Sequence, residues 1–203
     1  MTGRAMPSRP WTLPAAPARD EVGEFVAALR RLGAEDRDER GMLDAVRELA
    51  LRLAVSQDLW LEERMCRPDP EQGFGIHVLH EEPEHALAVF VVSWLPQRGT
   101  APHDHGTWAV IVGLDGEERN ELWRRVDDGT RPGYAEIEKR GERLLGPYAA
   151  LALPAGAIHS VRNETDRLSV SLHVYGTHVN FTRRSQYDPD ARTETPYKVR
   201  TYA

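Results

Sequence analysis

Three histidines have the spacing of metal ligands. His103 and His105 flank a single residue, and in a β-strand such a pair shares one face with about 7 Å of strand between them. Two imidazoles so placed can hold one metal ion, although an exposed loop pair has the same pattern. His159 follows the Pro-x-Gly turn of residues 154–156 at the start of a predicted strand. Alone it would be interpreted as structural, but with the first pair it makes a third ligand.

A second polar set lies near the end of the predicted strands. Ser171, His173 and Tyr175 alternate with apolar residues, so their side chains share one face of a strand. Such a file can form a hydrogen-bond relay in which the serine orients the histidine and the histidine orients the tyrosine hydroxyl. A strand with one solvated face is the alternative interpretation of the same pattern.

The elements that must position these residues change in type along the chain. Apolar residues recur at helical spacing in the first third, and short β-type segments separated by Gly, Pro and Asn turns follow. We therefore expect a single domain over residues 1–203, with an irregular arm (1–19), a helical region (20–65), a β-barrel (73–185) and a polar tail (186–203).

Many short strands at near-regular spacing favour a barrel or jelly roll. The expected strands are 74–79, 86–95, 107–114, 121–125, 135–139, 149–153, 158–162, 168–175 and 179–182.

Composition excludes several classes of protein. The net charge of −6 and the lack of a long basic run argue against nucleic-acid binding. No segment approaches the ~18 apolar residues of a membrane span. The single cysteine, Cys66, cannot form an intramolecular disulfide, and residues 1–20 lack the apolar core of a secretory signal. These features lead us to expect a cytoplasmic protein.

The histidine segments resemble the two motifs of the cupin superfamily. The resemblance implies a mainly β fold, the cupin double-stranded β-helix or jelly-roll barrel, preceded here by N-terminal α-helices. Ala109 stands where the first motif usually has a glutamate ligand, so the implied ligand set is three histidines without a carboxylate. Such a set suits Fe(II) or Zn(II). The matching residues are Gly99, His103, His105, Gly113 or Gly116, Gly146, Pro154, Gly156, His159 and Asn163.

With Ser171, His173 and Tyr175 added, the sequence resembles the thiol dioxygenases, the family of cysteine dioxygenase and 3-mercaptopropionate dioxygenase. The resemblance covers roughly residues 75 to 190. It implies one Fe(II) per chain and the conversion of a small thiol carboxylate and O2 to a sulfinic acid. Ala109 and Val110 occupy the place of the cysteine that crosslinks to the tyrosine in cysteine dioxygenase, so we expect no thioether.

The family resemblance also implies a cation for the substrate carboxylate. Arg184 or its neighbour Arg183 follows the relay strand where the bacterial enzymes carry an arginine, and Arg184 has the better spacing. His77 stands where cysteine dioxygenase carries an arginine on an early strand, and it is a further candidate for substrate binding. The substrate stays open among 3-mercaptopropionate, cysteine and mercaptosuccinate.

Two other classes remain compatible with the sequence. One is a cupin enzyme with Zn or Mn that acts as an isomerase or hydrolase, and the other is a non-catalytic cupin that binds a small ligand. We expect a monomer or small homo-oligomer whose partners are a thiol and O2, and neither nucleic acid nor a membrane.

Overall fold

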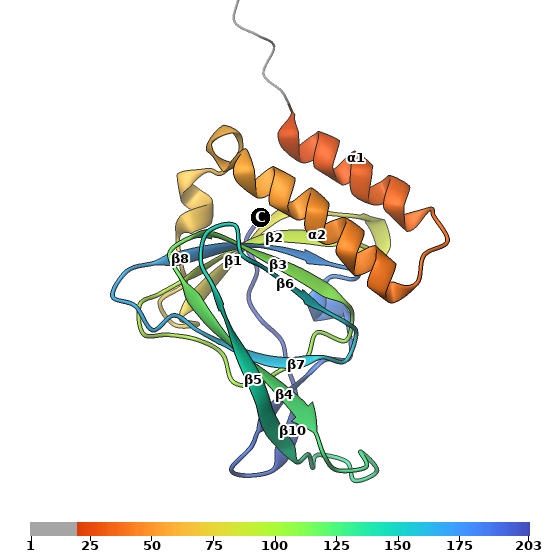
Figure 1. Cartoon of the computed structure of the whole chain (residues 1–203). Helices are drawn as coiled ribbons and strands as arrows, with labels where there is room; N and C mark the ends of the chain where they lie inside the picture. Colours follow the sequence, from red (N-terminus) through yellow and green to blue (C-terminus); the bar gives the residue numbers. More distant parts are fainter. Residues whose placement is uncertain (1–19) are drawn as a thin grey trace, which may run out of the picture.

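The computed structural model describes residues 20–203, and the expected irregular arm over residues 1–19 lies outside them. Two helices come first, α1 (Glu21–Gly33) and α2 (Glu39–Val55) (Figure 1). Each begins after an aspartate whose side chain accepts a hydrogen bond from a backbone N–H of the first turn, as helix N-caps do.

Short 3-10 turns and ten strands follow in the described chain, joined by loops. The turns are Gln57–Leu59, Glu63–Cys66, Pro83–His85 and Val179–Phe181. The strands are β1 (Phe74–Glu81), β2 (Ala88–Trp94), β3 (Ala109–Asp115), β4 (Glu118–Arg125), β5 (Ile137–Leu145), β6 (Ala150–Leu153), β7 (Ile158–Arg162), β8 (Ser169–Tyr175), β9 (Ser185–Asp188) and β10 (Thr193–Pro196).

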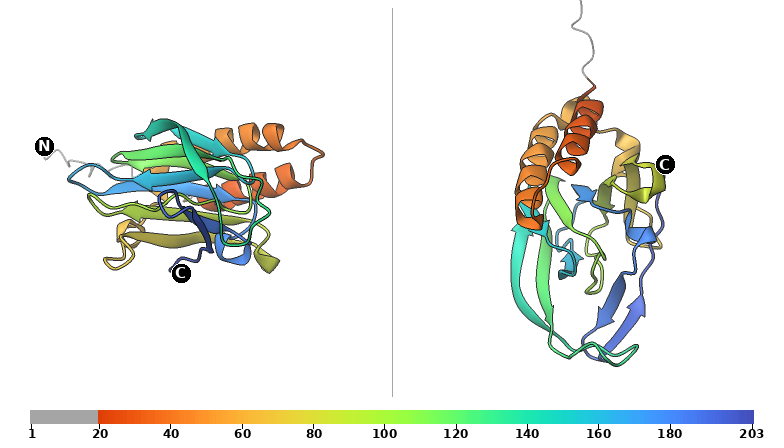
Figure 2. Two further views of the ribbon diagram at one scale, coloured as in Figure 1. Left: turned by 90° about the horizontal axis from the view of Figure 1, so that it is seen from below. Right: turned by 90° about the vertical axis from the view of Figure 1, so that its right-hand side faces the viewer.

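The strands form a double-stranded β-helix. A five-stranded sheet has the order β1-β2-β8-β3-β6, and a three-stranded sheet has the order β5-β4-β7. The chain passes between the two sheets at each of the steps β3 to β4, β5 to β6, β6 to β7 and β7 to β8, and all pairings within them are antiparallel. Figure 2 shows the sheets from two further sides. The expected fold class, mainly β with N-terminal helices, is confirmed.

The five-stranded sheet separates two hydrophobic cores. Helices α1 and α2 cover its outer face (Figure 1), and that core includes Val46 of α2 together with Val170, Leu172 and Val174 of β8. The opposite face lines the barrel interior, where Tyr175 belongs to the second core. The alternation expected for β8 is therefore confirmed, since its apolar residues pack under the helices and its polar residues point into the barrel.

Two local predictions need correction. The segment predicted as a strand over residues 179–182 is a 3-10 turn, in which the His178 side chain accepts a hydrogen bond from the N–H of Asn180. The strand predicted over residues 135–139 lies further along the chain, because β5 covers Ile137–Leu145. The polar tail contains the β9–β10 hairpin, and its end pairs with β1 through the backbone of Tyr202.

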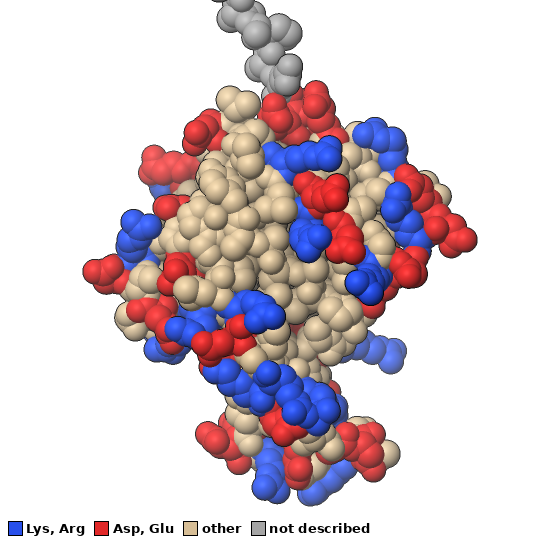
Figure 3. Space-filling model, viewed as in Figure 1, with Lys and Arg blue, Asp and Glu red and all other residues tan. Residues whose placement is uncertain are grey.

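Charged residues on the outer face of β4 and β5 are mutually paired. Figure 3 shows basic and acidic side chains intermingled in this part of the surface. Arg119 bonds to Glu142, and Lys139 bonds to both Glu142 and Glu121. Exposed pairs of this kind contribute little to stability, so the hairpin is held mainly by its backbone ladder.

None of the helices described between residues 20 and 203 combines the length and the apolar character needed to cross a membrane.

Two valines of α2 test the role of the outer core. Val46 is 1% exposed on the side of α2 that packs against the sheet, whereas Val55 at the end of the same helix is 71% exposed. Val46→Ala should lower the free energy of unfolding by about 2 kcal/mol, through lost burial and an unfilled cavity. Val55→Ala should change it by less than about 0.5 kcal/mol. Urea unfolding measures both, and equal losses in the two variants would contradict the packing described here.

Candidate metal centre

The three predicted ligand histidines meet inside the barrel. His159 lies on β7, while His103 and His105 lie in the loop between β2 and β3. The assumption that the pair sits on a strand is therefore wrong. Backbone bonds nevertheless fix the loop, because the N–H of His103 donates to the carbonyl of His159 at 2.8 Å and the reverse bond is 2.9 Å. This isolated bridge aligns the two segments that supply the ligands.

The geometry of the histidines suits a single metal ion. One ring nitrogen from each lies within 4.8 Å of the other two, and Nε2 of His159 is 3.2 Å from Nε2 of His105. A metal bound at about 2.0–2.1 Å to each nitrogen requires spacings of about this size. All three side chains are buried, at 5%, 2% and 0% exposure for His103, His105 and His159. The three residues could thus hold a metal ion, and imidazole donors fit iron or zinc.

Hydrogen bonds on the outer ring nitrogens orient two of the ligands. Nδ1 of His103 lies 2.9 Å from the carbonyl of Ala101, and Nδ1 of His159 lies 3.0 Å from Oδ1 of Asn120. A carbonyl can only accept, so each Nδ1 carries the proton and each Nε2 is left as a metal donor. Asn120 was not among the predicted site residues.

Burial keeps the ligands uncharged. It lowers the pKa of His103 to about 4, with a smaller contribution from nearby Arg184. The pKa values of His105 and His159 lie well below the usual range, first because of burial and then because of the neighbouring histidines. Neutral imidazole is the form that binds a metal, so the site is prepared for an ion at neutral pH.

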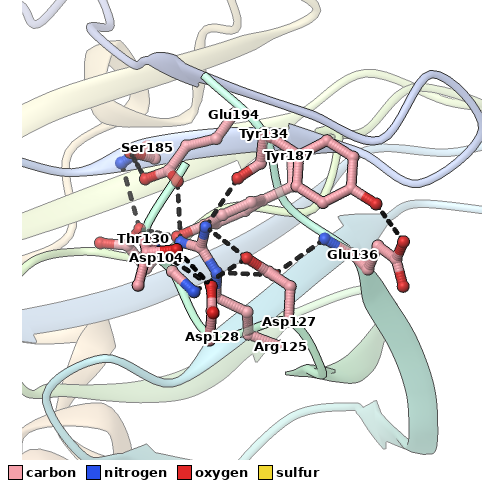
Figure 4. A network of polar contacts seen from close by, with 11 residues as sticks. Asp104, Arg125, Asp127, Asp128, Thr130, Tyr134, Glu136, Ser185, Tyr187 and Glu194 are labelled. Carbon is pink, nitrogen blue, oxygen red and sulfur yellow. Dashed lines mark hydrogen bonds and ion pairs between the residues drawn. The ribbon is translucent and has the colours of Figure 1, made fainter. Parts of the chain in front are cut away.

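Asp104, between the first two histidines, connects their loop to the β9–β10 hairpin. Its Oδ2 accepts hydrogen bonds from the Tyr187 hydroxyl at 2.8 Å and from the Ser185 N–H at 3.1 Å. Its Oδ1 accepts from the Gly106 N–H at 2.8 Å. A carboxylate with three such bonds holds the loop in one conformation, and Figure 4 shows Asp104 beside Ser185 and Tyr187.

The same network continues to the end of β4. Ser185 donates to Glu194 at 2.8 Å, Glu194 accepts from Arg125 at 2.7 Å, and Arg125 also binds Asp127 at 2.8 Å (Figure 4). The turn after β4 and the β9–β10 hairpin are therefore joined at the far end of the barrel, where Tyr134 bridges Thr193 (Figure 2). The hairpin that contacts Asp104 of the histidine loop is therefore also held by the turn after β4.

The predicted relay is present on β8. Ser171 Oγ lies 2.9 Å from His173 Nε2, and His173 Nδ1 lies 2.8 Å from the Tyr175 hydroxyl. All three residues are buried, and the ring of Tyr175 lies 4.9 Å from that of His105. The relay therefore ends beside the metal ligands. Ala109 pairs with Tyr175 in the sheet, and Cys66 lies in a 3-10 turn outside the pocket, so no thiol stands where a crosslink would form.

A pocket joins the histidines, the relay and one arginine. Arg184 is 5% exposed, its guanidinium carbon lies 4.3 Å from the centre of the Tyr197 ring, and its Nε donates to the Tyr197 carbonyl at 3.2 Å. Its Nη2 is buried without a hydrogen-bond partner. The pocket is lined by Phe74, Ile76, Phe90, Val92, Trp94, Thr100, His103, His105, His159, Val161, His173, Tyr175, Val179, Arg184, Tyr197 and Val199.

Two predicted substrate-binding residues lie elsewhere. Arg183 is exposed and does not line the pocket, because adjacent residues of an extended segment point to opposite sides. His77 faces away from the barrel interior and bonds to the carbonyl of Arg67 at 2.8 Å. Its neighbours on the inner face of β1, Phe74 and Ile76, line the pocket instead. Both assignments are corrected.

Several residues of the site were not predicted from the sequence. Tyr197 and Val199 come from the polar tail, and no local pattern marks them as parts of a pocket. Glu118 and Asn120 of β4 are 2% and 0% exposed. Glu118, Asn120 and Leu122 are spaced two residues apart, and Leu122 packs against the inner core. This spacing was the one feature of the sequence that indicated an inward orientation of Glu118 and Asn120.

Comparison with known protein families finds none that matches this sequence. The solved structures that resemble it include proteins of the cupin superfamily. A Thermus thermophilus protein is 25% identical, with 57% of this chain and 92% of that chain covered and a TM-score of 0.42. Oxalate oxidase with glycolate is 13% identical, with 58% and 59% covered and a TM-score of 0.43. The cupin domain of an XRE-family transcriptional regulator from Enterobacter cloacae is 18% identical, with 51% and 96% covered and a TM-score of 0.37.

Asn120 offers a test of the metal site. Asn120→Ala removes the acceptor that orients His159 and should weaken Fe(II) binding about 10- to 100-fold, as loss of such a supporting contact typically does. Chelator competition under argon measures this affinity. Glu121→Gln, on the outward side of the same strand, is the control and should bind Fe(II) as the wild type does. Unchanged affinity in Asn120→Ala would contradict the ligand assignment of His159.

Proposed function

We propose that this protein is a mononuclear Fe(II) thiol dioxygenase, which converts a small thiol carboxylate and O2 to the sulfinic acid. The observation that carries the proposal is the convergence of three elements in one pocket. These are a buried cluster of three histidines, a Ser–His–Tyr relay and a buried arginine with a free donor. A metal hydrolase or a simple ligand-binding barrel does not require this combination.

The bound iron would supply the redox chemistry that joins O2 to a sulfur atom held beside it. His103, His105 and His159 are the residues that would hold it, and a set of neutral ligands leaves the ion its full positive charge. That charge would favour the thiolate form of a substrate, and a pocket lined by these residues would keep the two reactants close together.

Arg184 is the group proposed to bind the substrate carboxylate. Its guanidinium is fixed by the Tyr197 ring and carbonyl, and the unpartnered Nη2 is a donor that a carboxylate oxygen would satisfy. A preoriented arginine loses little further freedom on binding, so it can position the thiol end of a short acid.

The pocket walls favour a thiol with a single carboxylate. Phe74, Ile76, Phe90 and Val92 provide apolar surface, and none of the pocket-lining residues described is an acid that would pair with the ammonium of cysteine. Arg184 is the sole arginine or lysine among them, so the second carboxylate of mercaptosuccinate would lack a partner. We propose 3-mercaptopropionate or a close analogue as the substrate.

Thiol-dependent oxygen consumption tests the function. The protein loaded anaerobically with Fe(II) should consume one O2 per 3-mercaptopropionate and yield the sulfinate, with lower kcat/KM for cysteine and mercaptosuccinate. An oxygen electrode and product mass spectrometry measure both. No uptake with any thiol, despite stoichiometric iron, would contradict the proposal and favour a Zn- or Mn-dependent isomerase or hydrolase at the same histidines.

The arginine pair provides a matched test of substrate binding. Arg184→Gln should raise KM for 3-mercaptopropionate about 10- to 100-fold, because one charge-assisted contact of roughly 1.5–3 kcal/mol is lost. Oxidation of cysteamine, which has no carboxylate, should change little. Arg183→Gln removes the exposed neighbour and should leave both substrates unaffected. An equal rise in KM for cysteamine would argue against a carboxylate contact at Arg184.

A further inference from the structure

The relay on β8 does not stop at Ser171. Glu118, on β4 of the opposite sheet, accepts a hydrogen bond from the Ser171 hydroxyl at 3.2 Å. Its other oxygen accepts a long 3.5 Å bond from the Asn120 amide. Glu118 is 2% exposed and forms no ion pair with any residue of the described part of the chain. A carboxyl group is therefore buried at the end of the relay without a countercharge.

A continuous hydrogen-bonded path leads from the pocket to this carboxyl group. It runs from the Tyr175 hydroxyl to His173 Nδ1 at 2.8 Å, from His173 Nε2 to Ser171 Oγ at 2.9 Å, and from Ser171 Oγ to Glu118 Oε2 at 3.2 Å. Tyr175 and His173 line the pocket, whereas Glu118 does not. Each of these groups except the carboxylate can both donate and accept, so the path can carry a proton.

The protonation state of Glu118 sets the direction of every bond in the path. When Glu118 is ionised it can only accept, so Ser171 donates to it and accepts from Nε2–H of His173. Nδ1 of His173 is then an acceptor, and the Tyr175 hydroxyl donates to it. In this state the oxygen of Tyr175 presents only lone pairs to the pocket.

When Glu118 is protonated, the order reverses. Its O–H donates to Ser171, the Ser171 hydroxyl donates to Nε2 of His173, and Nδ1–H of His173 donates to the oxygen of Tyr175. The Tyr175 hydroxyl is then free to donate a hydrogen bond into the pocket. Trp94 Nε1, 3.4 Å from Ser171 Oγ, donates to that oxygen in both states, so neither arrangement leaves it without a partner.

We propose that Glu118 is the final acceptor of the proton that the substrate thiol loses when it becomes a thiolate. This inference rests on the proposed thiol dioxygenase function. The S–H bond breaks with its electron pair kept by sulfur, and Tyr175 takes the proton. Tyr175 passes its own proton to Nδ1 of His173, Nε2 passes one to Ser171, and Ser171 passes one to Glu118. The net change is thiol plus carboxylate to thiolate plus carboxylic acid, and it leaves Tyr175 as a donor toward the pocket.

The environment of Glu118 supports proton exchange over a purely structural role. Burial raises its pKa to about 7, against smaller opposing effects of the hydrogen bonds from Asn120, Ser171 and Trp94. The two titratable groups within the path are neutral, since burial lowers the pKa of His173 to about 3 and raises that of Tyr175, and Arg184 is the charged group that acts on the Tyr175 end. His159 on β7, beyond Asn120, is neutral for the same reason. A glutamine would fill the same space without the free-energy cost of a buried charge. A purely structural role would therefore not require a carboxyl group at this position.

Proton counting on thiol binding tests the proposal. Iron-loaded protein is mixed with 3-mercaptopropionate under argon at about pH 8, where a free thiol of pKa about 8.5 or higher stays mostly protonated. A pH-indicator dye in weak buffer reports released protons. The wild type should release clearly less than one proton per bound thiol, because the negative charge of the bound thiolate raises the pKa of Glu118 further and the carboxyl group then keeps the proton. Glu118→Gln, which cannot retain it, should release close to one. Glu117→Gln alters the adjacent exposed glutamate and should behave as the wild type does.

Two further measurements test whether the proton count depends on the Glu118 carboxyl group and on the path that leads to it. Ser171→Ala keeps the carboxyl group but breaks the path, and it should release a proton as Glu118→Gln does. Infrared spectra of the metal-free wild type should contain a protonated-carboxyl band that titrates near neutral pH and is missing from Glu118→Gln.

Equal proton release by the wild type and Glu118→Gln, with normal wild-type O2 uptake, would overturn the role of Glu118 alone. Absence of thiol-dependent O2 uptake in the wild type would overturn both this role and the proposed function.

Discussion

The two faces of strand β8 lie in different environments, an apolar core under the helices and a polar barrel interior. The rest of the architecture depends on this constraint. It lies between β2 and β3, so its backbone is fully paired and its side chains alternate between the two faces of the sheet. Val170, Leu172 and Val174 pack beneath the helices, and the helices in turn keep that face dry. The barrel interior then receives three polar side chains, which need hydrogen-bond partners within the protein because they are buried. The relay is the result of that requirement.

The interior contains little fixed charge beyond one arginine and one carboxyl group. The three clustered histidines are neutral because burial and mutual proximity disfavour the imidazolium form. Burial lowers the pKa of Arg184 and raises that of Glu118, so each charge is destabilised in the free protein. An anion bound beside Arg184 and a proton bound to Glu118 would each relieve one of these penalties. The proposed function uses both effects, since it requires a bound carboxylate and a transferred proton.

The segment after β8 closes the barrel and completes the pocket. Asp104 anchors the β9–β10 hairpin to the loop that carries the first two histidines, and Arg184 and Tyr197 come from either side of that hairpin. The last residues return to β1, where Tyr202 pairs with the backbone of Ile76 and Val78. The loop of His103 and His105 and the segments of Arg184 and Tyr197 are thus held together through the β9–β10 hairpin.

Local patterns in the sequence determined the mainly β fold, the spacing of the histidines and the shared face of Ser171, His173 and Tyr175. These features depend on the two-residue period of a strand and on turn residues, which act over a few positions. Tertiary structure alone decided the rest. A shift of one residue reverses the face of a strand, so packing placed His77 outside the pocket and Ile76 inside it. Glu118, Asn120 and Tyr197 joined the site through pairings between distant segments, and no periodicity within their own segments records which partner they meet.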